Sequence, residues 1–199
     1  TYFGHQLQSI EGGFLLTNSP FEYDMFRMYR NHGLTRSVES PQMFRNSRVD
    51  SRFDFFLLGN NFRNSNVNAF IGLLDFDRIH EHIKKRYEIS VLFCNELDKS
   101  KYYTPESNNI LFCLPIILKE NPNGENLNKI KNYCDKNSIE YRPIISGFLG
   151  YQTPYKKYNL NPQHYPNSLL LHENGIYVGL HSKLKKEDVK KLVSFLNSI

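Results

Sequence analysis

The sequence has few cysteines, and none is placed like a metal ligand or a disulfide partner. Cys94, Cys113 and Cys134 are isolated, odd in number and without C-x-x-C spacing. Zinc sites and disulfide frameworks use paired or clustered cysteines. We therefore expect reduced thiols, each buried as a small apolar residue.

Long apolar runs are also missing. No run approaches the roughly 20 residues that a membrane helix needs, and no charged and then apolar leader precedes Thr1. An apolar share of 40% with 23% charged residues is typical of a soluble globular protein, for which we expect a cytoplasmic location and no membrane partner. The chain begins inside a motif and without Met, so we interpret it as a fragment of a longer protein.

The net charge of +5 does not by itself indicate a nucleic acid partner. Basic proteins can bind phosphates, but lysines spread over amphipathic segments are typical of a solvated helical face. The lysines in question are Lys84, Lys85, Lys129, Lys131, Lys185, Lys186, Lys190 and Lys191. We expect no nucleic acid partner.

The first half of the chain predicts a strand, a helix, an irregular stretch and a long helix. The apolar residues 14–17, after a glycine pair, indicate a buried strand, and a helix follows within 19–33, between a Ser-Pro start and a glycine stop. Residues 34–52 are polar and aperiodic and hold four arginines, as in functional or mobile loops. Over 65–95, apolar positions recur at helical spacing, which predicts one long helix with a kink near 75–77.

The second half alternates strands with helices. We predict strands at 110–118, 141–145 and 176–180, a turn at 121–124, and helices over 127–134 and 185–198. A polar connection at 98–109 marks a domain boundary, so that the predicted domains are 1–97 and 98–199. Interleaved strands and helices make the second of these a small α/β or α+β domain.

The opening residues carry the most specific motif. The segment Thr1-Tyr2-Phe3-Gly4-His5-Gln6-Leu7-Gln8-Ser9-Ile10-Glu11-Gly12-Gly13 resembles the cofactor-lysine motif of the DegT-type sugar aminotransferases. In that family a lysine lies six residues before a Glu-Gly-Gly that opens a strand, and counting back from Glu11 reaches His5. A lysine would form a Schiff base with pyridoxal phosphate, whereas an imidazole cannot.

Within this superfamily, histidine at the lysine position is the mark of the nucleotide-sugar 3-dehydratases. These enzymes hold the cofactor without a covalent link and use the imidazole as the base. The resemblance therefore implies that His5 is the catalytic base and that Tyr2 is among the cofactor-binding residues.

A second motif precedes the long helix. The segment Gly59-Asn60-Asn61-Phe62-Arg63-Asn64-Ser65 resembles the family's Gly-Tyr-Asn-Tyr-Arg motif, although Asn60 replaces the usual aromatic residue. In the family the asparagine reaches the cofactor phosphate of the neighbouring subunit, which implies a cofactor-binding Asn61 and a homodimer. Without the first motif, Asn60 and Asn61 would indicate only a turn, with Asn61 as a cap.

Three later motifs resemble the small domain of the same family, particularly its histidine-bearing branch. They are Arg142-Pro143-Ile144-Ile145-Ser146-Gly147, Tyr165-Pro166-Asn167 and His172-Glu173-Asn174-Gly175. Many aminotransferases of the family carry a substrate-binding histidine just after the Arg-Pro. Ile144 and Ile145 stand there in this chain, which favours the dehydratases.

Metal sites are not indicated. One dehydratase subfamily binds an iron–sulfur cluster through cysteines shortly after the histidine motif, but residues 6–92 contain no cysteine, which excludes that type. His80 and His82 are two residues apart on one predicted helix, which makes them poor joint ligands.

The resemblance covers the whole chain and implies an α/β fold. The fold would be the C-terminal half of a fold-type-I aminotransferase-like enzyme, comprising the end of the large cofactor-binding domain and a small α+β domain. The implied activity uses pyridoxal 5′-phosphate or pyridoxamine 5′-phosphate to remove the 3-hydroxyl from a nucleotide-diphosphate 4-keto-6-deoxy sugar, in deoxysugar or lipopolysaccharide biosynthesis. Glutamate would act as amino donor, and the fragment alone would be inactive.

Two alternatives remain open at this point. The protein could be an ordinary nucleotide-sugar aminotransferase, or a non-catalytic fragment or degenerate homologue that serves as a dimerisation or binding module. The motifs name no substrate-binding residue.

Overall fold

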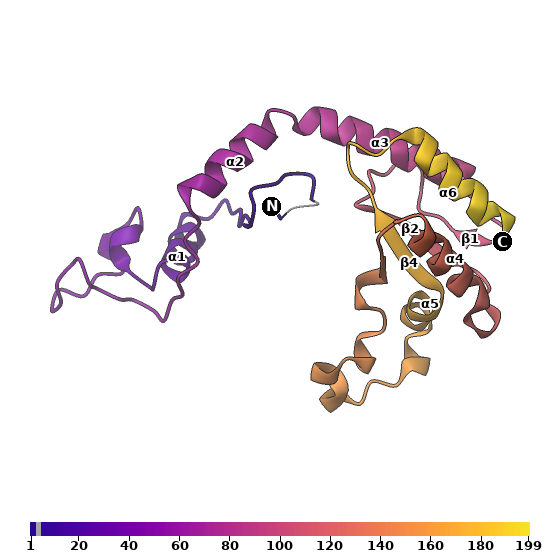
Figure 1. Ribbon diagram of the computed structural model, residues 1–199. Helices are drawn as coiled ribbons and strands as arrows, with labels where there is room; N and C mark the ends of the chain where they lie inside the picture. The colour runs from indigo at the N-terminus through magenta and orange to yellow at the C-terminus, as the bar shows by residue number, and fades with distance from the viewer. Residues whose placement is uncertain (3–4) are drawn as a thin grey trace. The chain divides into compact units, whose positions relative to one another are not determined.

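The computed structural model describes residues 1–2 and 5–199, which form two compact units, Thr1–Asp77 and Arg78–Ile199 (Figure 1). The division falls before residue 97, because the helix over residues 79–96 contributes to the core of the second unit. The domains 1–97 and 98–199 stay a prediction.

The helices of the first unit are α1 (Pro20–Arg30), α2 (Asn66–Phe76) and the short 3-10 helices η1 (Thr35–Ser37) and η2 (Pro41–Met43). Helix α1 begins as predicted, since Ser19 Oγ accepts a hydrogen bond from the Glu22 N–H at 3.3 Å and Pro20 occupies the first turn. The chain then reverses through Gly33, whose φ of 83° is a conformation that favours glycine.

The buried strand predicted at residues 14–17 is wrong. These residues belong to no strand, and Leu16 is 91% exposed. A strand needs a neighbour for its backbone N–H and C=O groups. The described part of the first unit contains no strand that could pair with this segment.

The long helix predicted over 65–95 is two helices, α2 and α3 (Ile79–Glu96). Between them Arg78 takes φ −105° and ψ 2° and is the N-cap of α3. The interruption lies directly after the predicted kink at 75–77.

The second unit is built on an antiparallel sheet. Its strands are β1 (Tyr102–Tyr103), β2 (Cys113–Leu118), β3 (Tyr141–Pro143) and β4 (Gly175–Gly179), in the order β1-β2-β4-β3. Leu114 of β2 pairs with Val178 of β4, and Ile116 pairs with Ile176. The side chains of these four residues are buried, as expected where one face of a sheet supports a core.

Helices α3, α4 (Glu125–Lys136) and α6 (Lys186–Ser198) share that core. Figure 1 shows α6 beside α3. The apolar residues that recur at helical spacing in the helix predicted over 185–198 are all buried, namely Val189, Leu192, Val193 and Leu196. The predicted terminal helix is therefore confirmed.

Between β3 and α5 (Pro166–Asn174) the chain forms an arm of 3-10 turns. The turns are η4 (Ile144–Ser146), η5 (Leu149–Tyr151), η6 (Thr153–Tyr158) and η7 (Pro162–His164), and they project from the sheet in orange in Figure 1. The strand predicted over 141–145 ends early because Ile145 takes φ 39°, outside the extended region. The predicted turn at 121–124 contains η3 (Pro122–Gly124).

Strand β1, helix α5 and the arm carry no pattern that predicted them from the sequence. In the described residues, no helix is long and apolar enough to cross a membrane.

Candidate functional site

His5, the predicted catalytic base, lies exposed on a loop ahead of α1. Its N–H donates to the Tyr2 carbonyl oxygen at 3.0 Å, and the two rings meet edge to face with centroids 6.2 Å apart. Phe3 and Gly4 of the same motif lie outside the described residues. The structure thus brings together the predicted site residues Tyr2 and His5.

Asn61, the predicted phosphate ligand, lies on a segment that runs along the end of α1. The backbone N–H of Asn60 donates to Tyr29 O (2.8 Å), and that of Phe62 donates to Arg30 O (2.9 Å). Asn61 itself forms an isolated antiparallel bridge with Asn31. Backbone pairing therefore positions Asn61, although its side chain is exposed.

Two glycines allow this close backbone approach. A Cβ on Gly33 would lie 1.8 Å from the Leu57 carbonyl oxygen, and a Cβ on Gly59 would lie 2.3 Å from the Gly33 nitrogen. Neither distance is possible for a real side chain. The sequence predicts Gly33 as a helix stop, and in the structure it also makes room for the segment that carries Asn61.

The amide of Asn61 is oriented by its neighbour. Arg63 Nε donates to Asn61 Oδ1 at 3.0 Å, so that the oxygen is engaged and the amide NH₂ is the group left to donate. A neutral N–H donor suits an anionic phosphate oxygen. The residues present therefore fit a phosphate-bearing cofactor at this position.

Buried carboxylates organise the aperiodic stretch after α1. Asp24 accepts hydrogen bonds from the N–H groups of Glu39 (2.9 Å) and Ser40 (3.1 Å), and Asp54 accepts one from the N–H of Asn46 (2.8 Å). Both side chains are buried. The stretch is thus a loop tied down at several points.

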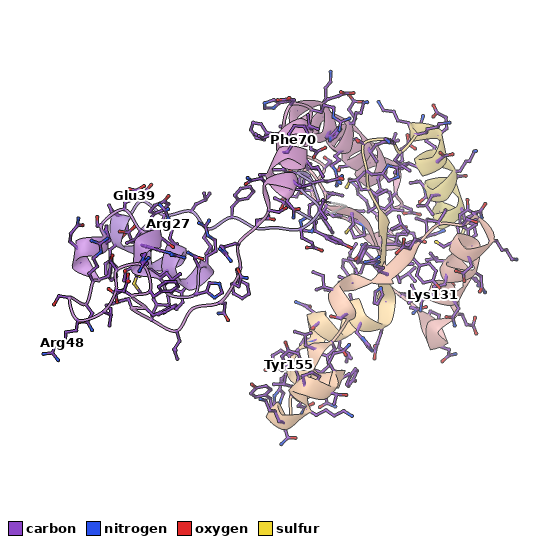
Figure 2. All side chains as sticks on the ribbon, turned by 60° about the vertical axis from the view of Figure 1, so that its left-hand side comes forward. Arg27, Glu39, Arg48, Phe70, Lys131 and Tyr155 are labelled. Atoms are coloured by element: carbon purple, nitrogen blue, oxygen red, sulfur yellow. The ribbon has the colours of Figure 1, made fainter. Side chains whose placement is uncertain are left out.

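Figure 2 shows how this loop lies against α1. Arg27 of α1 and Glu39 of the loop form an ion pair at 3.9 Å, while Arg48 lies at the outer tip of the loop. Sequence reasoning missed Asp24 and Asp54. The sequence does contain a signal for Asp24. It precedes the apolar Met28 by one helical turn, which places both residues on the same, inward face of α1.

In the second unit, residues of the three later motifs meet at the base of the arm. The Tyr151 and His172 rings are 5.1 Å apart, and a Cβ on Gly147 would lie 2.1 Å from His172 Nδ1. Phe148 is buried, with its ring 5.9 Å from that of Tyr165. Gly147 is therefore required for His172 to pack where it does, which gives this set of motif residues a structural role.

The cysteines are free thiols, as expected. Cys94 and Cys134 are buried and Cys113 is half-buried, and burial raises the pKa of all three thiols. A raised pKa leaves less thiolate, which is the reactive form. Among the described residues, no group of three or more His, Cys, Asp or Glu side chains is arranged to hold a metal ion.

Known proteins resemble this chain along almost its whole length. The GDP-4-keto-6-deoxy-D-mannose 3-dehydratase of Yersinia pseudotuberculosis is 27% identical over 208 residues, which cover 98% of this chain and 52% of the relative. The solved structure of the E. coli GDP-4-keto-6-deoxy-D-mannose-3-dehydratase with bound hydrated PLP has a TM-score of 0.83 at 22% identity, over 98% of this chain and 52% of that chain. The structure of Helicobacter pylori PseC, an aminotransferase involved in the biosynthesis of pseudoaminic acid, has a TM-score of 0.68 at 17% identity. The match covers 92% of this chain and 47% of that chain.

These likenesses confirm the predicted α/β fold class. The chain spans about half the length of the relatives that it matches. The pattern of the DegT/DnrJ/EryC1/StrS aminotransferase family matches residues 2–197. The resemblance carried by the opening motif is therefore confirmed, and the chain belongs to the DegT/DnrJ/EryC1/StrS aminotransferase family.

Proposed function

We propose that this chain is part of an enzyme that uses pyridoxal or pyridoxamine 5′-phosphate to remove the 3-hydroxyl from a nucleotide-diphosphate 4-keto-6-deoxy sugar. The observation that carries the proposal is His5, an imidazole that stands where the family's motif has a lysine. The relative from Yersinia pseudotuberculosis, named as a 3-dehydratase, is similar over nearly the whole chain. Its name supports a GDP-linked sugar as the substrate.

In this proposal His5 moves the proton. A neutral imidazole accepts a proton at one ring nitrogen and can return it near neutral pH, as a general base and then an acid must. His5 is exposed on its loop, so a substrate can reach it. The cofactor supplies an electron sink when bound.

Asn61 and Tyr2 are the proposed cofactor-binding residues. The Asn61 NH₂ would donate to the cofactor phosphate of a neighbouring subunit, which makes the active unit a homodimer with composite sites. Such an arrangement requires no contact between His5 and Asn61 of the same chain. We further propose that residues 1–97 belong to the large cofactor-binding domain and residues 98–199 to the small domain, in a cytoplasmic enzyme with glutamate as amino donor.

The second candidate is a nucleotide-sugar aminotransferase that holds its cofactor without a covalent link. The likeness to PseC, an aminotransferase, supports it. The two activities differ in their products, because dehydration gives a 3-deoxy sugar and transamination gives an amino sugar. A full-length protein that forms neither product would support the third candidate, a non-catalytic dimerisation or binding module.

The His5 side chain provides the direct test. Full-length protein incubated with pyridoxal phosphate and reduced with borohydride should carry no phosphopyridoxyl group on residue 5, because imidazole forms no stable imine. His5→Lys should gain that group and shift the product towards the amino sugar. His5→Asn, which has neither amine nor base, should lose about 10²–10⁴-fold in dehydration rate without gaining the group.

Mass spectrometry of the residue 5 peptide reads out the first result, and product analysis reads out the others. A phosphopyridoxyl group on His5 itself would contradict the match to the family's motif. Normal dehydration by His5→Asn would exclude His5 as the base.

Asn61 is tested through cofactor affinity. Asn61→Ala should weaken cofactor binding by roughly 1–3 kcal/mol, the scale of a hydrogen bond to a charged group. Asn60→Ala is the matched control, because the hydrogen bonds that Asn60 forms with Tyr29 and His32 use its backbone, which the substitution keeps. Equal affinities of both variants, measured by titration, or full activity of a sedimenting monomer would refute this role.

A further inference from the structure

Ser9 ties the loop that carries His5 back to Thr1. The Ser9 N–H donates to the Thr1 carbonyl oxygen at 2.8 Å. Ser9 Oγ lies 2.6 Å from Thr1 Oγ1 in a further hydrogen bond, and Ser9 is buried. Ser9 is thus fixed to Thr1, and the contacts of the residues that follow His5 bear on where His5 lies.

One face of α2 and Asn64, which precedes the N-cap of that helix, hold this loop. The Nδ2 groups of Asn64 and Asn68 donate to the Glu11 carbonyl oxygen at 3.0 and 3.1 Å. A Cβ on Gly72 would approach the Ser9 Cβ to 3.1 Å, so the missing side chain lets the loop sit close to the helix. Positions 68, 72 and 75 recur at the spacing of one helical face.

Asp75 is the anchor nearest to His5. Its Oδ2 accepts a hydrogen bond from the Gln8 N–H at 2.9 Å, and the residue is only 7% exposed. A hydrogen bond to a carboxylate is among the stronger kinds in proteins. Asp75 also lies in the last turn of α2, where the helix dipole disfavours a negative charge. The hydrogen bond from the Gln8 N–H offsets this unfavourable interaction with the dipole.

We propose that Asp75 is a positioning residue for His5, acting through the Gln8 N–H. The inference rests on the proposed role of His5 as the base. Gly72 and Asn68 complete the support. Gly72 lets the loop lie close to α2, and Asn68 holds the far end of the loop at the Glu11 carbonyl oxygen. Loss of the Asp75 carboxylate then misplaces the imidazole while leaving its chemistry and the proposed phosphate ligand Asn61 unchanged.

The test uses the full-length protein that contains this chain, with three variants. Asp75→Ala removes the acceptor, whereas Asp75→Asn keeps an acceptor oxygen of the same size without the charge. Asp77→Asn is the matched control, since Asp77 is an exposed carboxylate two residues further along the chain. The first readout is hydrogen exchange at the Gln8 amide, and the second is the separation of kcat from KM for sugar turnover.

Asp75→Ala should accelerate exchange at the Gln8 amide about tenfold or more, since each 1.4 kcal/mol is a factor of ten and a bond to a charged group contributes at least that much. It should lower kcat with little change in KM. Asp75→Asn should lie between Asp75→Ala and the unsubstituted protein in both readouts, and Asp77→Asn should match the unsubstituted protein.

Unchanged exchange at Gln8 in Asp75→Ala would overturn the anchor, and faster exchange with an unchanged kcat would overturn the positioning role. Failure of the proposed function is distinguishable, because it removes turnover from the unsubstituted protein as well. In that case the rate at which diethylpyrocarbonate modifies His5 replaces kcat. A rate that differs between Asp75→Ala and Asp77→Asn supports positioning, and equal rates overturn it.

Discussion

The two compact units of this chain are stabilised in different ways. In Arg78–Ile199, three helices and a sheet bury one continuous apolar core that includes Phe93, Leu114 and Ile130. In Thr1–Asp77, the buried apolar cluster consists of Met28, Val38 and Phe44, with partly buried neighbours. Many large apolar side chains of this unit are exposed, among them Phe14, Leu15, Leu16, Leu58, Phe62, Val67, Phe70, Leu73, Leu74 and Phe76.

The unit with the continuous apolar core is therefore not the unit that carries the predicted site residues His5 and Asn61. Buried carboxylates that accept backbone N–H groups hold much of the first unit, namely Asp24, Asp54 and Asp75. Exposed large apolar side chains in such number are typical of surfaces that contact other protein segments. The chain spans about half the length of the relatives that it matches.

The largest expected effect comes from the core of the second unit. Phe93→Ala should lower the free energy of unfolding by about 3–5 kcal/mol, because Phe93 is fully buried and its removal leaves a cavity. Phe70→Ala, at a helical position that is 60% exposed, should change it by less than about 0.5 kcal/mol. Urea unfolding of the 199-residue chain measures both. Equal losses in the two variants would mean that α2 is covered and that the comparison is wrong.

A smaller, local effect is expected in the first unit. Gly33→Ala should cost about 1–2 kcal/mol from its left-handed φ alone, and its side chain would also collide with the Leu57 carbonyl. Hydrogen exchange should accelerate at the amides of Asn60 and Phe62, with no change in the second unit. Gly13→Ala is the control, because a Cβ there meets nothing within 4 Å. Unaltered exchange in Gly33→Ala would show that the glycine is not needed for this approach.

The smallest effect concerns a single hydrogen bond in the second unit. The Tyr102 hydroxyl donates to the Leu196 carbonyl oxygen at 2.8 Å, and burial raises its pKa to about 12 from the ordinary 10.0. Tyr102→Phe should lower the free energy of unfolding by about 1 kcal/mol at neutral pH. Tyr103→Phe, the exposed neighbour on β1, should have no measurable effect.

The same tyrosine makes the second unit sensitive to alkali. The folded state disfavours the phenolate, so the contribution of Tyr102 to the free energy of unfolding should be constant below the unfolded pKa near 10 and fall as the pH rises towards 12. The part of the fall due to Tyr102 should be absent from Tyr102→Phe. A fall of the same size in that variant would assign it to other groups.

Local signals predicted several elements correctly. Ser19 and Pro20 start α1 because an N-cap oxygen and a fixed φ act within one turn. The period of Val189, Leu192, Val193 and Leu196 predicted α6, because a helix next to a core buries one face. The strand at 14–17 failed because pairing requires a second strand, which apolar character alone does not provide.

The sequence by itself determined the family resemblance, and it predicts His5 and Asn61 as site residues from their positions within short motifs. Only the tertiary structure showed what holds those motifs. The approach of Gly59 to Gly33 and the bond from Gln8 to Asp75 join residues far apart in the chain, and no local period or propensity encodes such contacts. In both contacts at least one partner is a backbone group. Every residue carries a backbone, so the residue types in the sequence do not specify which backbone group will be met after folding.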